Sequence, residues 1–240
     1  MTSTLDLLIG GSAVGAAALG AAYWATYGVR SQWLGATAWR GSRNIAAVAL
    51  TFDDGPAEDT ERILDTLEDS GVRAAFFMLG RQVARYPHIA RRIVDAGHEI
   101  GNHSYSHPVY LFHRSAQIRR ELERTQELIA DVTGVRPLWS RPPYGVRSPG
   151  YFRAARALGL RTVQWSVAGY DWKPRPASAI AGAVARGLDA GAIVLLHDGD
   201  GDGDGTRDRR QTVEALPAIV DAVTTRGLVV APLATLLRTC

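Results

Sequence analysis

The chain has 240 residues, of which 46% are hydrophobic and 21% are charged, and this length allows one sizeable domain or two small ones. The formal net charge of +3 comes almost wholly from arginine, since Lys173 is the only lysine, and no basic cluster alternates with aromatic residues. This pattern argues against a nucleic-acid-binding protein. The single cysteine, Cys240, excludes an intramolecular disulfide. Nothing in the sequence indicates an obligate protein partner.

The amino-terminal stretch, residues 5–29, contains a single charged residue, Asp6, and it is long enough to cross a bilayer. Small residues recur with the spacing of packed membrane helices in Gly11-x-x-x-Gly15 and Ala16-x-x-x-Gly20. We therefore expect residues 1–43 to be a transmembrane anchor and linker that crosses a bacterial-type cell membrane once. A buried helix and a cleaved signal peptide are the alternatives, although no basic residue precedes the apolar stretch as it does in signal peptides.

Three arginines follow this stretch and none precedes it: Arg30, Arg40 and Arg43. By the positive-inside rule, these charges would leave the rest of the chain in the cytoplasm.

From residue 44 to residue 240, apolar runs alternate with amphipathic stretches. The runs predicted to be strands are 46–52, 73–79, 98–103, 137–141, 161–167, 192–197 and 228–233. The clearest predicted helix is 115–133, which Ser115 could cap and Gly134 could end. This alternation predicts an α/β fold, a distorted TIM-like barrel of about seven parallel strands with helical crossovers.

Two adjacent carboxylates, Asp53 and Asp54, come directly after the first predicted strand. Like charges side by side repel, and the burial of either without a partner is costly. An ordinary turn is one explanation, because Asp favours tight turns and Gly55-Pro56 follows. The other explanation is a divalent cation that binds one of the two carboxylates.

His103 and His107 lie four positions apart after the third predicted strand. With Asp54 they would form a three-ligand site with an open position, the arrangement of a hydrolytic metal, and Asp53 would be free to act as a base. The carboxyl ends of the strands meet on one side of a parallel barrel. We therefore expect a catalytic centre from residues at several strand ends: Asp53, Asp54, His103, His107, Arg141, Asp171 and His197.

These residues belong to five motifs that occur in this order: Thr51-Phe52-Asp53-Asp54, His103-Ser104-Tyr105-Ser106-His107, Arg141-Pro142-Pro143-Tyr144, Asp171-Trp172 and Leu195-Leu196-His197. Together they resemble the motifs of polysaccharide deacetylases with a NodB homology domain, carbohydrate esterase family 4. The resemblance identifies residues 44–240 as one such domain. It implies a metal-dependent hydrolase that removes N-acetyl groups from N-acetylhexosamine residues of a cell-envelope glycan, such as peptidoglycan or a chitin-like oligosaccharide.

The resemblance also implies a role for each matching residue. Asp53 would be the general base, and Arg141 would hold it through a charge-assisted hydrogen bond. One divalent metal ion, Zn²⁺ or else Co²⁺, would be bound by Asp54, His103 and His107. His197, with its tautomer fixed by Asp171, would protonate the leaving amine.

The remaining motif residues would contact the substrate. The backbone N–H of Tyr144 would stabilise the oxyanion, next to Pro143. Trp172 and Leu195 would wall a small acyl pocket that favours acetyl over longer chains, although core packing is the alternative for both.

Two features depart from the family pattern. The fourth motif often begins with an Asp three positions before Asp171, where this chain has Ala168. Asp and Gly alternate from Asp198 to Gly205. A calcium loop would need a glutamate where Arg209 or Gln211 stands, so the favoured interpretation is a flexible acidic loop beside the metal centre.

Two other functions stay open. One is a deacylase or deformylase of a lipid-linked amino sugar, which the cytoplasmic charge bias favours. The other is an inactive glycan-binding protein, against which the intact base, metal ligands and acid argue. The location of the domain also stays open. An envelope glycan as substrate favours the envelope side of the membrane, whereas the arginines after residue 29 favour the cytoplasmic side.

Overall fold

The computed structural model describes residues 4–203 and 208–238, with side chains from residue 15 onward. Within these residues, eight strands form one sheet in which every strand pairing is parallel. The order across the sheet is β5-β4-β3-β2-β1-β7-β6, and β8 pairs with the first residues of β1. The strands are β1 Ala47–Asp53, β2 Ala75–Met78, β3 Glu99–Asn102, β4 Trp139–Ser140, β5 Arg161–Thr162, β6 Val167–Ala168, β7 Ile193–His197 and β8 Val229–Val230.

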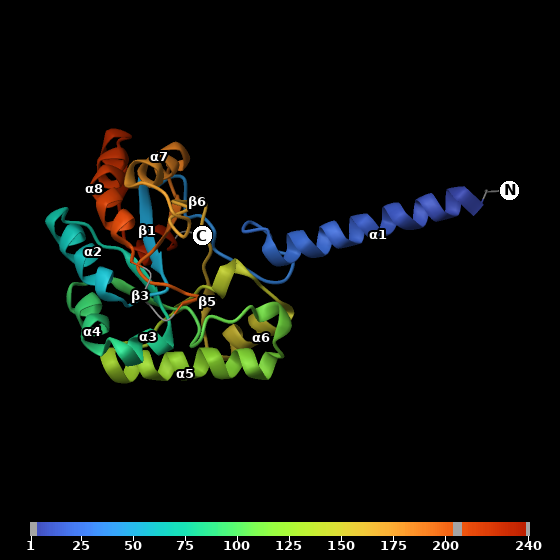
Figure 1. Ribbon diagram of the computed structural model, residues 1–240, viewed down its shortest axis with the longest axis horizontal. Helices are drawn as coiled ribbons and strands as arrows, with labels where there is room; N and C mark the ends of the chain where they lie inside the picture. The colour runs from blue at the N-terminus through green and yellow to red at the C-terminus, as the bar shows by residue number, and fades with distance from the viewer. Residues whose placement is uncertain (1–3, 204–207, 239–240) are drawn as a thin grey trace.

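Helices surround the sheet, as Figure 1 shows. Their apolar faces build one core with the outer face of the sheet, to which α2, α3, α4, α5, α7 and α8 contribute. The helices are α1 Thr4–Tyr27, α2 Glu58–Asp69, α3 Gly80–Arg85, α4 Pro87–Asp95, α5 Ser115–Thr133, α6 Pro149–Ala157, α7 Ala177–Gly187, α8 Arg210–Thr225 and α9 Leu233–Leu236, with 3₁₀ turns η1 Tyr110–Phe112 and η2 Pro143–Gly145.

The alternation of side chains along β1 directs Asp53 to the inside of the curled sheet. Val48, Leu50 and Phe52 belong to the outer core with the helices, whereas Ala47 and Ala49 belong to a second core on the inner face. Successive side chains of a strand point to opposite faces. Asp53 therefore shares the inner face with the two alanines, at the carboxyl end of the strand.

The sheet is curled but open, so the predicted barrel is correct only as a partial barrel. The predicted strand 161–167 is two short strands, β5 and β6, which raises the number of strands from about seven to eight. They form the two ends of the sheet, and no strand in the described residues joins them. Instead, Ala38 N donates to Thr162 O at 2.9 Å and Gly41 N to Gly191 O at 2.8 Å, so this segment connects the end of β5 with the start of β7.

The predicted helix 115–133 is confirmed as α5. Gly134 ends it in the left-handed region, with φ of 74°. The predicted cap is wrong, because Ser115 Oγ donates to Gly150 O at 3.1 Å. The Gln117 side chain accepts from the backbone N–H of Arg114 at 2.8 Å and so closes the first turn in its place.

The predicted membrane span is not supported. The stretch does form a helix, α1, which points away from the rest of the molecule (Figure 1). Among the residues that the structure describes, however, no helix combines the length and apolarity needed to cross a membrane. Much of α1 is glycine and alanine, whose small side chains add little apolar surface.

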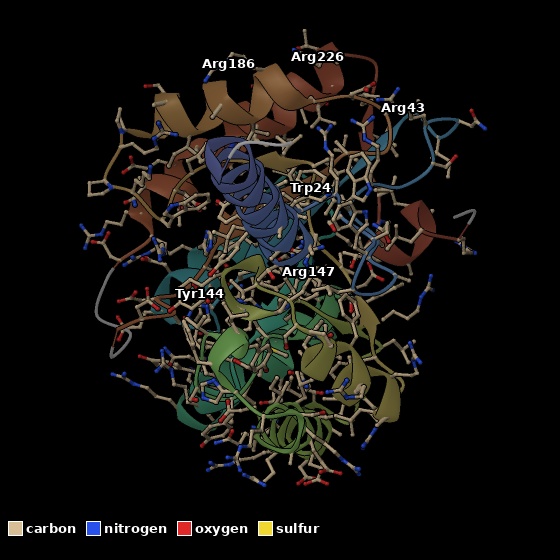
Figure 2. All side chains as sticks on the ribbon, turned by 90° about the vertical axis from the view of Figure 1, so that its right-hand side faces the viewer. Trp24, Arg43, Tyr144, Arg147, Arg186 and Arg226 are labelled. Atoms are coloured by element: carbon tan, nitrogen blue, oxygen red, sulfur yellow. The ribbon has the colours of Figure 1, made fainter. Side chains whose placement is uncertain are left out.

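Arg147 holds the inner end of α1. Its buried guanidinium donates to the backbone oxygens of Gly28 and of Ser31, the latter at 3.0 Å, and its backbone N–H donates to Thr26 O at 3.2 Å. Figure 2 looks along α1 and shows Arg147 close to this end of the helix. Arg147 lies in the same loop as Tyr144, so α1 is joined directly to a loop at the carboxyl end of the sheet.

Candidate active site

The loops at the carboxyl ends of the strands hold an unusual group of backbone conformations. Five non-glycine residues of the described chain have positive φ: Asp54 (79°), Ser104 (80°), His107 (63°), Tyr144 (57°) and Tyr170 (56°). All of them follow β1, β3, β4 or β6. Such conformations cost about 1–3 kcal/mol each and persist where the surrounding structure imposes them, most often at functional sites.

Asp54, His103 and His107 present one atom each to a common point. These atoms lie within 4.8 Å of one another, and all three residues are buried. Asp54 Oδ1 is 3.4 Å from His103 Nε2 and 3.3 Å from His107 Nε2. This oxygen is buried and has no hydrogen-bond partner among the described residues, an arrangement that is costly unless a cation occupies the point.

The far nitrogens of the two histidines fix their tautomers. His103 Nδ1 lies 2.8 Å from the backbone oxygen of Arg141, and His107 Nδ1 lies 3.2 Å from Asp202 Oδ1. Both neighbours are acceptors, so each Nδ1 carries the proton and each Nε2 presents a lone pair to the common point. Two such imidazoles and a carboxylate fit a divalent metal ion.

The electrostatics of Asp54 and His107 agree with this assignment. Burial raises the pKa of Asp54, but the nearby imidazoles of His103, His107 and His197 outweigh it and hold the pKa well below its usual value. Burial lowers the pKa of His107 more than Asp54 raises it, which favours the neutral ring. Burial likewise lowers the pKa of His103, but Asp53 and Asp54 raise it above its ordinary value. The raised pKa favours a proton on Nε2 of His103, and a cation would compete with that proton for the nitrogen.

Asp53 is paired with a buried arginine. Arg141 Nη1 donates to Asp53 Oδ1 at 2.7 Å and to Thr51 Oγ1 at 2.9 Å, and Nη2 donates to the backbone oxygen of Gln164 at 3.0 Å. The Arg141 guanidinium also lies over the ring of Phe77, 4.1 Å from its centroid. Asp53 is therefore held in one orientation. It is not one of the three residues that converge on the common point, called the metal point below because it is the candidate position of a metal ion.

His197 and Asp171 form a second charged pair. His197 Nδ1 lies 2.8 Å from Asp171 Oδ1, and the backbone N–H of His197 donates to Asp171 Oδ2 at 2.7 Å. Burial lowers the pKa of His197, but Asp171, followed by Asp54 and Asp53, raises it to about 9. The protonated imidazole is favoured at neutral pH, and its Nε2 is the nitrogen that Asp171 leaves free.

One pocket of about 350 Å³ collects most of the residues that the sequence predicts for the site. The predicted residues in its wall are Asp53, Asp54, His103, His107, Tyr144, Trp172, Leu195 and His197. The buried side chains of Arg141 and Asp171 lie behind this wall, each bonded to a residue in it. Pro143 is buried and is not part of the wall.

Three residues of the wall are not among the residues predicted from the sequence: Gly145, Trp165 and Arg209. Arg209 is almost fully buried, and its Nη1 donates to the backbone oxygen of Asp171 at 3.1 Å. An arginine before a helix is common, so no sequence signal marks it. An aromatic residue inside a predicted strand, such as Trp165, also has no distinguishing pattern. The acidic repeat contributes Asp200, Gly201 and Asp202 to the wall.

Comparison with known proteins gives consistent similarities. The family model described as polysaccharide deacetylase matches residues 40–163. A peptidoglycan-N-acetylglucosamine deacetylase of Bacillus cereus is 37% identical over 193 residues, 80% of this chain and 68% of that protein. A chitooligosaccharide deacetylase of a Bradyrhizobium species is 36% identical over 194 residues, 78% of this chain and 89% of that protein.

A peptidoglycan-N-acetylglucosamine deacetylase of Listeria monocytogenes is 40% identical over 152 residues, and there the chain spans only 32% of the relative's length. Among solved structures, a peptidoglycan N-acetylglucosamine deacetylase in complex with a naphthalenyl benzamide has a TM-score of 0.79 at 35% identity, covering 85% of this chain and 94% of that chain. A CE4 family pseudoenzyme of Bacillus anthracis has a TM-score of 0.76 at 32% identity, covering 84% of this chain and 68% of that chain.

Proposed function

We propose that this chain, which belongs to the polysaccharide deacetylase family, hydrolyses the N-acetyl group of N-acetylhexosamine residues in a cell-envelope glycan. The observation that carries the proposal is the convergence of three separate groups on one pocket. These are Asp53 with Arg141, the triad Asp54-His103-His107, and His197 with Asp171. A pseudoenzyme shares this fold, so the fold alone is not evidence of activity. The evidence for catalysis is that all three groups of residues are present.

The metal ligands would be Asp54 Oδ1, His103 Nε2 and His107 Nε2, with Zn²⁺ as the proposed ion and Co²⁺ as the alternative. When bound, the ion would supply Lewis-acid polarisation and would acidify a water molecule. Oxygen and imidazole nitrogen ligands suit both metals, so the choice between them is left to measurement.

Asp53 would act as the general base. Its carboxylate accepts a proton from the water molecule that adds to the amide carbonyl carbon. Arg141 binds one oxygen, Oδ1, at 2.7 Å, and this leaves Oδ2 as the oxygen available to the proton. The backbone N–H of Tyr144 would donate to the carbonyl oxygen as negative charge develops there.

His197 would then complete the reaction as the general acid. Its Nδ1 is bonded to Asp171, so Nε2 donates the proton to the amine nitrogen as the carbon–nitrogen bond breaks. The products are acetate and a free amino sugar. The Trp172 ring packs edge-on to the His197 ring, with centroids 5.5 Å apart, and would limit the space for the acyl group together with Leu195.

The substrate is proposed to be peptidoglycan or a chitin-like oligosaccharide, because relatives of this chain carry both names. We accordingly propose that the domain works at the cell envelope. A reporter fused to the carboxyl terminus, active on only one side of the cell membrane, tests this placement. Reporter activity confined to the cytoplasm would contradict it.

The test of function is a release assay with the purified full chain. The protein is stripped with a chelator, reloaded with Zn²⁺ or Co²⁺, and incubated with peptidoglycan, N-acetylglucosamine oligomers and a lipid-linked N-acyl amino sugar. We expect acetate from at least one glycan, none after chelation, and far slower release from an Asp53→Asn variant loaded in the same way. Release only from the lipid-linked sugar would favour the alternative substrate, and no release of acetate or formate from any of them would contradict the enzyme.

A further inference from the structure

The acidic loop Asp198–Gly203, which follows β7 directly, lies against the proposed metal ligands. A Cβ atom on Gly201 would lie 2.6 Å from His107 Cε1 and 2.7 Å from Asp54 Oδ1. A Cβ atom on Gly199 would lie 2.3 Å from the backbone oxygen of Asp54. Such distances are closer than atoms tolerate, so only glycine allows the loop backbone to approach the ligands this closely.

Four hydrogen bonds hold this loop in place. Asp198 Oδ1 accepts from the backbone N–H of Gly55 at 3.0 Å, and its Oδ2 accepts from Thr60 Oγ1 at 2.7 Å. Arg209 Nε donates to Gly199 O at 2.6 Å, and Arg81 Nη2 donates to Gly201 O at 2.6 Å. The described part of the loop is therefore hydrogen-bonded on both sides of the ligands.

The carboxylates of the loop do not converge on one point as those of a calcium loop do. Asp198 is buried and binds the turn after β1. Asp202 lies on the other side of the ligands, where its Oδ1 contacts His107 Nδ1 at 3.2 Å and also accepts a hydrogen bond from the Tyr144 hydroxyl. Within the described part of the loop, the alternation of Asp and Gly thus serves two separate contacts.

We propose that Asp202 is a positioning residue for His107, which it holds with Nε2 directed at the metal point. The two histidines of the triad differ in how they are held. His103 uses a backbone oxygen, that of Arg141, whereas His107 Nδ1 has Asp202 as its hydrogen-bond partner among the described residues. A carboxylate behind a metal-binding histidine fixes the tautomer and ring orientation and increases the basicity of the ligand nitrogen.

The contact with Tyr144 extends the role of Asp202 to the loop after β4. The Tyr144 and His107 rings lie with centroids 4.4 Å apart, and Asp202 Oδ1 contacts a polar atom of each. One carboxylate thus connects a proposed metal ligand with the residue whose backbone N–H is the proposed oxyanion donor. The inference rests on the proposed metal centre, and its test separates the two.

The test measures metal affinity of the full chain by calorimetry and the visible absorption spectrum of the Co²⁺ form. We expect Asp202→Ala to weaken Co²⁺ and Zn²⁺ binding by about 10- to 100-fold, the range for loss of such a partner, and to change the Co²⁺ spectrum. Asp202→Asn keeps an acceptor oxygen and should recover part of the affinity. Equal affinities for Asp202→Ala and the unsubstituted protein would overturn the proposal.

Two controls make the result specific. Asp208→Ala removes another exposed acidic side chain of the same chain region, one paired with Arg210 instead of a ligand, and should leave affinity unchanged. Thermal unfolding of the metal-free variants checks folding, which should be unaffected because the Asp202 side chain is 67% exposed. If the unsubstituted protein binds neither metal, the proposed metal centre fails. If it binds metal and Asp202→Ala binds as tightly, only the role of Asp202 fails.

Discussion

The guanidinium of Arg141 donates a 2.7 Å hydrogen bond to the carboxylate of Asp53, and neither side chain has appreciable access to solvent. The pair sits on the inner face of the sheet, where Arg141 also bonds to Thr51 and to the backbone oxygen of Gln164. The pair belongs to the packed interior as well as to the proposed site. Its removal should therefore affect stability and activity in different ways.

We expect Arg141→Met to lower the free energy of unfolding by about 3–5 kcal/mol, because it leaves the Asp53 carboxylate buried without its partner. Urea denaturation of the metal-free protein measures this. The double variant Arg141→Met with Asp53→Asn removes that charge and should be more stable than Arg141→Met alone. Strictly additive losses would show that the two residues are not coupled.

Asp53→Asn should reduce turnover by about 10²- to 10⁴-fold, since an amide cannot accept the proton from water. Metal affinity should stay close to that of the unsubstituted protein, because the metal point is formed by Asp54, His103 and His107. Calorimetry with Zn²⁺ and an acetate-release assay measure the two properties. The matched control is Asp54→Asn, which should lose metal binding, and the same loss in Asp53→Asn would contradict the separate roles.

The pH profile of turnover should fall on its alkaline side as His197 loses its proton. Burial lowers the pKa of His197, but Asp171 raises it to about 9, and a general acid acts only while protonated. Asp171→Asn removes the charge that favours the imidazolium, so the alkaline limb should move to lower pH. An alkaline limb at the same pH in both proteins would exclude His197 as the acid.

The same residue links stability to pH in the metal-free protein. The pKa of His197 rises from 6.5 to about 9 on folding, so its contribution is fully present below pH 6.5 and is lost as pH rises through about 9. We expect the difference in melting temperature between the unsubstituted protein and His197→Gln to shrink over this pH window. A difference that grows with pH would contradict the assignment.

Leu195→Ala should broaden the acyl selectivity. Leu195 is buried in β7 and also lines the pocket, so its truncation enlarges the space proposed for the acetyl methyl group. The ratio of kcat/KM for butyryl over acetyl substrates should rise by about 10- to 200-fold. Competition assays with matched N-acyl oligomers measure this ratio. No change would indicate that Leu195 only packs the core.

The convergence of the triad could be predicted because each of its parts follows a strand. Asp54 comes after β1, and His103 and His107 come after β3, two strands separated only by β2. In a parallel sheet the carboxyl ends of the strands lie on one side, so residues that follow different strands come close together in space. The family resemblance seen in the five motifs is confirmed by the family model and by relatives above 30% identity.

The sequence does not predict that the sheet stays open instead of closing into a barrel. An apolar run indicates a strand but does not show whether the end strands pair with each other, since closure depends on how strongly the sheet curls. The run 161–167 is uniform enough to suggest one strand, yet Thr162 pairs toward β4 and Val167 toward β7. The sequence also could not assign Arg209 to the site, because its contact with the backbone of Asp171 exists only after α8 has packed against the site.

The register of β1 and β7 places Asp53 opposite His197, although more than half of the chain separates them. Until β7 is synthesised and inserted, one side of β1 presents unpaired backbone groups, and a truncated or partly folded chain has the proposed metal ligands without the proposed acid. Deacetylation would thus begin only when the last third of the domain has joined its first strand. Turnover would then report complete folding, and partly made copies of the enzyme would leave the glycan untouched.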